Sequence, residues 1–167
     1  LFLGLVRDES GLPKVIENLK NNYDSNFNFN LKIVGNLNKK LYNIANNKKY
    51  SKHITNIGFG ERKDFIKLFS DCFCGLCLVT FGGSYTSNTI PSKVIDYIQH
   101  NIPVIATKNL GYTSEIIEKY QIGLLVENDL NELMKKIKYI YDNQEIFQKN
   151  ISQFLNEYKY TDIRDIF

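Results

Sequence analysis

Short apolar runs alternate with amphipathic stretches along the whole chain. The runs are rich in Ile, Leu and Val, as buried strands are, and we expect six strands at Leu1–Val6, Leu31–Gly35, Ile54–Phe59, Cys72–Thr80, Ile102–Thr107 and Ile122–Val126. Between and after them, apolar residues recur at helical spacing, which predicts helices that include Leu12–Leu19, Leu41–Ile44, Phe65–Phe69, Ser114–Tyr120, Asn128–Tyr141 and Gln144–Tyr158, and a short helix that begins at Pro91. This alternation predicts an α/β fold: one Rossmann-like domain over residues 1–167, with a doubly wound, parallel, six-stranded sheet.

Ligands of such sheets bind outside the carboxyl ends of the strands, where the strand order reverses. Four predicted loops emerge at that edge: Arg7–Ser10, Phe59–Arg62, Phe81–Ile90 and Lys108–Thr113. In the commonest strand order, the first and fourth strands flank the crevice. The Arg7 loop and the segment Gly82–Asp96 would then face each other.

The segment Asn88–Ala106 predicts a loop, a helix opened by Pro91, a turn and a buried strand. Lys93 and Asp96 lie three residues apart, on one face of that helix near its positive end. Asp96 is suited to accept hydrogen bonds from the vicinal hydroxyls of a ribose.

Two further features of these loops favour a phosphate ligand. The backbone of Gly82 and Gly83 can approach a phosphate closely, and Arg7 and Lys93 would supply cations. The pattern fits a nucleoside-diphosphate site, but equally a plain turn beside a solvated ion pair. Neither G-x-G-x-x-G at the first strand nor G-K-[ST] is present.

Composition and charge exclude some classes of protein. Apolar residues make up 43% of the 167 residues, so we expect a folded chain with a real core. The net charge of +3 argues against nucleic-acid binding. The abundance of Asn, Lys and Ile is typical of a low-GC microbe. Because the chain begins inside an apolar run, without Met, we expect a fragment whose preceding part is absent.

Three cysteines, Cys72, Cys74 and Cys77, lie in one apolar run. On a strand, Cys72 and Cys74 would share one face and Cys77 would point to the other, so one metal ion could not easily collect all three. The two histidines, His53 and His100, are remote in sequence. We therefore expect small buried side chains rather than metal ligands, and free thiols that suit the cytoplasm.

The run Ile90–Ala106 resembles the P-x-K-x-x-E-Y-x-x-x-G-x-P-V-I-A segment of GT-B glycosyltransferases of the group 1 family. Further resemblances keep the family's order and span most of the chain: Leu3–Gly4, Lys32–Gly35, Ile57–Gly60, Asp64–Leu68 with Asp71, Gly111–Ile116 and Ile122–Val126. The resemblance implies the C-terminal, donor-binding lobe of a two-lobed enzyme.

Such an enzyme moves a sugar from a nucleotide-sugar donor, UDP- or GDP-linked, to a glycan or lipid-linked acceptor, here in surface polysaccharide or capsule biosynthesis. The resemblance favours retention of configuration and no metal or other cofactor. It also implies that the isolated lobe is inactive, because the chemistry occurs in the cleft to the N-terminal, acceptor-binding lobe. We therefore assign no catalytic residue.

By this resemblance Asp96 matches the family's ribose-binding Glu, the loop at Phe59 would lie beside the base, and Asn88 stands where an earlier Glu contacts the transferred sugar. The full set of predicted donor-binding residues is Gly4, Arg7, Phe59, Gly82, Gly83, Asn88, Ile90, Lys93, Asp96 and Gly111.

Besides Asp96 in place of Glu, the sequence departs from the family pattern at four positions. Asn88 is not a carboxylate, and Leu5 and Ser10 stand where the family often has Arg and Lys. We expect Arg7 to substitute for one of them. Asn101 replaces the turn glycine, and Asn tolerates left-handed geometry.

Other interpretations stay open at this point. One is a non-catalytic module, either a degenerate nucleotide-binding scaffold or a receiver-like signalling domain. For a receiver, Asp8, Glu9, Thr80 and Lys108 fit, but the third strand ends without an Asp to phosphorylate. Another is a sugar epimerase with the same two-lobed fold.

Contact with a membrane surface is also open. Lys135, Lys136 and Lys138, with Tyr139 and Tyr141, form either a solvated helix face or a contact for anionic lipid at the inner face of the membrane.

Overall fold

The structure is a computed structural model, and it describes residues 1–3, 11–21, 29–48, 53–58, 67–79, 90–127 and 129–158. Strands and helices alternate, as the hydrophobic pattern predicts. The strands are β1 (Phe2–Leu3), β2 (Leu31–Val34), β3 (Ile54–Gly58), β4 (Gly75–Cys77), β5 (Val104–Thr107) and β6 (Gly123–Val126). The helices are α1 (Leu12–Asn21), α2 (Lys39–Ala45), α4 (Ser92–Gln99), α5 (Tyr112–Tyr120), α6 (Leu130–Asp142) and α7 (Gln144–Glu157).

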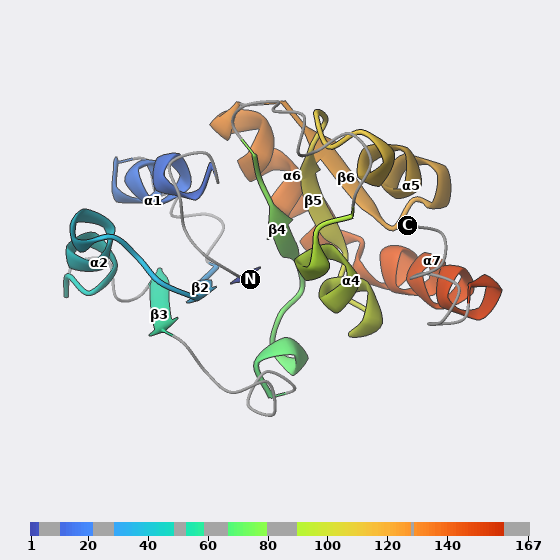
Figure 1. The fold of residues 1–167 in the computed structure, drawn as a ribbon, viewed down its shortest axis with the longest axis horizontal. Helices are drawn as coiled ribbons and strands as arrows, with labels where there is room; N and C mark the ends of the chain where they lie inside the picture. The colour runs from blue at the N-terminus through green and yellow to red at the C-terminus, as the bar shows by residue number, and fades with distance from the viewer. Residues whose placement is uncertain are drawn as a thin grey trace.

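The strands form two parallel sheets of three, in the orders β1-β2-β3 and β4-β5-β6. Main-chain hydrogen bonds of Leu1 join the two sheets: its nitrogen donates to the Cys74 oxygen at 2.7 Å, and its oxygen accepts from the Leu76 nitrogen at 2.8 Å. The strands therefore lie in the order β3-β2-β1-β4-β5-β6 (Figure 1), and the order reverses between β1 and β4. This confirms the doubly wound prediction and places the switch point at the β1–β4 seam.

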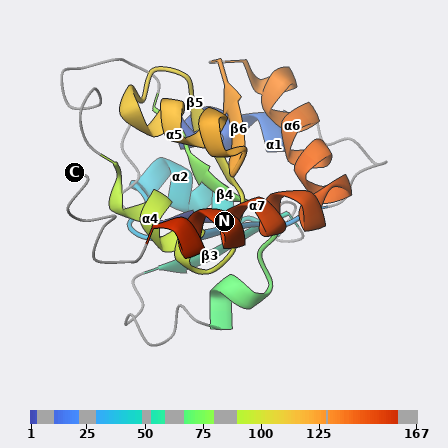
Figure 2. The same cartoon turned by 90° about the vertical axis from the view of Figure 1, so that its right-hand side faces the viewer.

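Helices cover both faces of the sheet, and each face has its own apolar core. One core joins α1, α2 and α6 to the strands; the other joins α4, α5 and α7 to them. Figure 2 shows α1 and α6 on one side of the strands and α4 and α5 on the other. Within β5, Ile105 packs into the first core while Val104 and Ala106 pack into the second, as expected of a central parallel strand buried on both faces.

The strand predicted at Cys72–Thr80 is shorter, because only Gly75–Cys77 is extended and paired. Residues 67–70 are helical, and the Cys72 thiol donates a hydrogen bond to the Leu68 carbonyl, so Cys72 precedes the strand. Cys72 packs against the α4–α5–α7 core and Cys74 lies in the other core, so the prediction that these two side chains share one face is wrong.

Cys74 and Cys77 are buried on opposite faces of the sheet, as the sequence predicts. Burial raises the pKa of the Cys74 thiol to about 12 and that of the Cys77 thiol to about 11. Both side chains therefore act as small apolar groups at neutral pH.

No helix among the described residues has the length and apolar character needed to cross a bilayer.

Candidate functional site

Tyr97 fixes α4 on the β1–β4 seam. Its side chain is completely buried, and its hydroxyl donates to the carbonyls of Leu76, at 3.3 Å, and Leu1, at 3.4 Å. Gly75 makes room for the ring, because a Cβ at this position would lie 2.3 Å from Tyr97 Cδ2. One tyrosine therefore holds the helix against the two strands at which the strand order reverses.

Lys93 lies one helical turn before Tyr97, on the same face of α4. Its Nζ atom is 4.4 Å from the centroid of the Phe2 ring in β1. Burial lowers the pKa of the Lys93 ammonium, an effect that the neighbouring Cys77 thiol opposes. In the part of the chain that the structure describes, this cation forms no ion pair with a carboxylate.

The first turn of α4 concentrates positive potential at the same place. Pro91 occupies the N-cap position and supplies no side-chain hydrogen bond, and the first turn contains no acidic residue. The helix dipole and the Lys93 ammonium therefore act together. A helix N-terminus of this kind binds anions, and the buried cation is a second, independent feature that favours one.

Asp96 and Ile90 lie on the same segment. Asp96 is half-buried one turn after Lys93, and Ile90 precedes the helix and packs against the α4–α5–α7 core. The sequence left open a solvated ion pair between Lys93 and Asp96. The structure contradicts this alternative, because Lys93 contacts the buried Phe2 ring instead.

Gly111 is placed in the neighbouring loop, at the N-cap of α5. Its φ of 49° favours glycine. Ser114 donates to the carbonyls of Thr107 and Lys108 at 3.3 and 3.1 Å, and the Thr107 hydroxyl oxygen accepts from the Val79 nitrogen at 3.1 Å. These bonds tie the carboxyl ends of β4 and β5 to the start of α5, beside the α4 site.

Six predicted donor-binding residues lie outside the described residues: Gly4, Arg7, Phe59, Gly82, Gly83 and Asn88. The structure places Ile90, Lys93 and Asp96 on one segment and Gly111 in the adjoining loop. Sequence reasoning missed Phe2, Gly75 and Tyr97, which position that segment. The family motif could have identified Tyr97, because it contains an acidic residue followed by Tyr. Phe2 and Gly75 are too distant in sequence from α4 to be linked to it.

The described histidines and acidic residues do not form a metal site. His100 lies at the far end of α4, as expected, where it stacks on Phe69 with ring centroids 3.9 Å apart. Among the described residues, no group of three or more His, Cys, Asp and Glu side chains could hold a metal ion. A site without metal remains a prediction.

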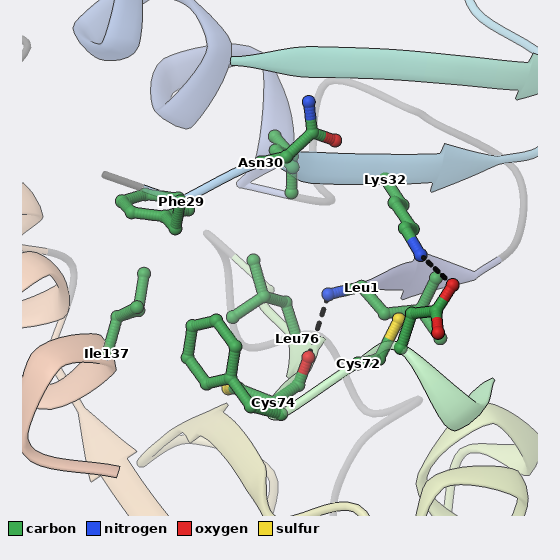
Figure 3. A pocket seen from close by; sticks show the side chains of 11 residues that line it. Leu1, Phe29, Asn30, Lys32, Cys72, Cys74, Leu76 and Ile137 are labelled. Atoms are coloured by element: carbon green, nitrogen blue, oxygen red, sulfur yellow. Dashed lines mark hydrogen bonds and ion pairs between the residues drawn. The ribbon is translucent and has the colours of Figure 1, made fainter. Parts of the chain in front are cut away.

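A pocket of about 120 Å³ lies at the opposite edge of the sheet, at the amino ends of β1, β2 and β4 (Figure 3). Its walls are mainly apolar and include Phe29, Leu76 and Ile137. Lys32 is its cation, and it is paired with Asp71 at 3.5 Å. Within the described part of the chain, the cation of this pocket is therefore paired with a carboxylate, whereas that of the α4 site is not.

A doubly wound parallel sheet with helices on both faces is a Rossmann-like fold. The family model described as "Glycosyl transferases group 1" matches residues 1–157, so the chain belongs to this family. The match removes the receiver-like alternative and favours a transferase over an epimerase. A search of curated proteins found no match.

Solved glycosyltransferases share the fold. A mutant of S. aureus TarM, in complex with fondaparinux, alpha-GlcNAc-glycerol and UDP, aligns over 99% of this chain and 33% of its own, with a TM-score of 0.70 and 18% identity. The apo lipopolysaccharide outer core galactosyltransferase WaaB aligns over 99% of this chain and 47% of its own, with a TM-score of 0.69 and 12% identity.

A shorter neighbour is the catalytic domain of cholesterol-alpha-glucosyltransferase from Helicobacter pylori. It aligns over 93% of this chain and 97% of its own, with a TM-score of 0.63 and 15% identity. These likenesses show a GT-B-like α/β fold. The chain spans less than half of the length of WaaB and of the Rickettsia africae glycosyltransferase, covering 47% and 42% of them.

Proposed function

We propose that this chain is the donor-binding lobe of a two-lobed glycosyltransferase, and that the α4 site holds the diphosphate of a nucleotide sugar. One observation carries the proposal: Lys93 is a largely buried cation without a carboxylate partner in the described chain, at a helix N-terminus beside the β1–β4 switch point. Burying such a charge is costly unless a ligand compensates it.

The residues of the site have distinct roles in this proposal. The first-turn N–H groups of α4 and the Lys93 ammonium bind the phosphate oxygens, and Asp96 accepts hydrogen bonds from the ribose hydroxyls. When the bond between the sugar and the diphosphate breaks, negative charge grows on the leaving phosphate. The helix terminus and Lys93 stabilise that charge without a large rearrangement. The remaining predicted donor contacts, from Gly4, Arg7, Phe59, Gly82, Gly83 and Asn88, complete the site.

Transfer of the sugar requires a partner for this lobe. We propose that an N-terminal lobe of the same enzyme supplies the acceptor site and the rest of the cleft, so that the isolated chain binds the donor but does not transfer the sugar. Alignment to less than half of several longer glycosyltransferases supports this proposal.

The family and the similar solved structures also suggest the donor, the acceptor and the biosynthetic pathway. We favour a UDP- or GDP-linked donor, a glycan or lipid-linked acceptor, retention of configuration, and a role in bacterial surface polysaccharide or capsule synthesis. The UDP named with TarM supports a UDP-linked donor, and the lipopolysaccharide named with WaaB supports a surface-glycan setting. The place of action would be the cytoplasm, at the inner face of the membrane, where a lipid-linked acceptor is accessible.

Calorimetric titration of the chain with UDP, GDP and ADP tests the donor site. We expect one of the three to bind at millimolar concentration or tighter. Lys93→Ala should weaken it about tenfold or more, because hydrogen bonds to charged groups contribute about 1.5–3 kcal/mol each. The exposed Lys135→Ala variant is the matched control and should bind as the wild type does.

The titration also separates the alternatives. No binding of any of the three nucleotides would contradict the proposal and leave a degenerate scaffold as the better description. The same titrations with Mg²⁺ and with EDTA should agree, since we propose that helix N–H groups and cations, not a metal, hold the diphosphate. A strong requirement for Mg²⁺ would contradict that part of the account.

A further inference from the structure

We propose that Phe2 is a positioning residue of this site: its ring face holds the Lys93 ammonium at the β1–β4 seam while the ammonium binds the diphosphate. The inference rests on the proposed function and adds to it a residue that touches no part of the donor. It also explains how a largely buried lysine is held without an acidic partner among the described residues.

The contact crosses the sheet. Phe2 is completely buried and belongs to the core shared with α1, α2 and α6. Lys93 extends from α4, which packs with the opposite core, and its Nζ reaches 4.4 Å from the ring centroid. The surrounding core fixes the ring, and Tyr97 fixes the helix that carries Lys93. Both ends of the contact are therefore held rigidly.

Lys93 differs from other lysines of the described chain. Five of them pair with carboxylates at 2.6–3.5 Å: Lys32, Lys40, Lys108, Lys136 and Lys138. A carboxylate beside Lys93 would neutralise the charge and compete with a phosphate for it. The negative face of an aromatic ring attracts the cation yet leaves its net charge available. This is the partner that an anion-binding cation needs.

A second lysine of the described chain also lies over a ring, and it serves as a contrast. Lys119 Nζ is 4.9 Å from the Tyr120 ring centroid at the end of α5, but Lys119 is exposed to solvent and lies in the last helical turn. Cations are favoured at that end of a helix. Lys93 lies at the opposite end of its own helix, where the helix dipole disfavours a cation. Its contact with Phe2 therefore has to offset this unfavourable interaction.

The alternative is that Phe2 only fills the core, in which case its size matters and its π-electrons do not. Fluorination separates these roles, because it withdraws the negative charge from the ring face and changes the shape little. We therefore compare the wild type with chains that carry 4-fluoro-, 3,5-difluoro- or pentafluorophenylalanine at position 2. Pentafluorophenylalanine at Phe147, a buried ring of the same core, is the matched control.

The first measurement is the dissociation constant for UDP and for GDP. It should rise stepwise with fluorine content at position 2, reaching about tenfold for the pentafluoro ring, as expected when a desolvated cation–π contact is lost. The second measurement is the pH profile of binding. Since the ring favours the charged ammonium, fluorination should move the alkaline loss of binding to lower pH, by about one unit. The Phe147 control should change neither.

An unchanged or tighter dissociation constant across the fluorinated series at position 2 would overturn the inference. If the pentafluoro chain does not fold, the 4-fluoro and 3,5-difluoro chains still give the trend. Failure of the wild type to bind any of UDP, GDP and ADP would instead refute the proposed function. If the wild type binds but the dissociation constant does not change with the fluorine content at position 2, only the proposed role of Phe2 is refuted.

Discussion

Lys93 and Asp96 occupy one helix, but different forces hold them. Lys93 is drawn into the fold by a buried ring, whereas Asp96 stays half-exposed one turn further on. The sequence predicted their spacing and their place near the start of a helix. It did not predict the burial of Lys93, because that depends on Phe2, whose contact with α4 exists only when β1 and β4 are adjacent.

Asp96→Ala gives a prediction at this scale. If Asp96 binds the ribose hydroxyls, the variant should lose about tenfold or more in affinity for UDP, in line with charge-assisted hydrogen bonds of about 1.5–3 kcal/mol. Its affinity for inorganic pyrophosphate, which has no ribose, should not change. Parallel calorimetric titrations with both ligands provide the test, and Asp142→Asn on α6 is the control. Equal losses for UDP and pyrophosphate would contradict the ribose role.

At the scale of elements, the positions of strands and helices followed from hydrophobic periodicity, and most strand bounds agree to within one or two residues. The error at Cys72–Thr80 has a physical cause. The apolar run begins after the helical residues 67–70 and passes through a bend at Phe73 before β4, and periodicity cannot separate short apolar segments of different conformation. The turn at Asn101 was predicted correctly, since its φ is 58°, in the left-handed region that Asn tolerates.

The packing of α4 on β4 gives a second prediction. Gly75→Ala should destabilise the fold by about 1–3 kcal/mol, because the added methyl group overlaps the Tyr97 ring. Chemical denaturation measures the free energy of unfolding. In the double variant Gly75→Ala, Tyr97→Leu, the smaller leucine side chain removes the overlap. The double variant should therefore lose less unfolding free energy than the sum of the losses in the two single variants. Strict additivity would contradict this packing.

At the scale of the molecule, the doubly wound sheet could be predicted because alternating strands and helices allow few topologies. The strand order was assumed from the commonest case, and the hydrogen bonds of Leu1 establish it. The carboxyl edge carries Lys93, which has no carboxylate partner among the described residues, while the pocket at the amino edge holds a paired lysine. This asymmetry, rather than pocket size, favours the carboxyl edge as the donor site.

The most direct test of that claim is to map the bound nucleotide by NMR, with ¹⁵N-labelled chain titrated with UDP, GDP and ADP. The account predicts that the largest amide shifts for the nucleotide that binds fall on Ser92, Lys93 and Val94, at the start of α4, and on Gly111 in the adjoining loop. Shifts centred on Lys32, Cys72 and Phe73 at the amino edge, with α4 unaffected, would contradict it.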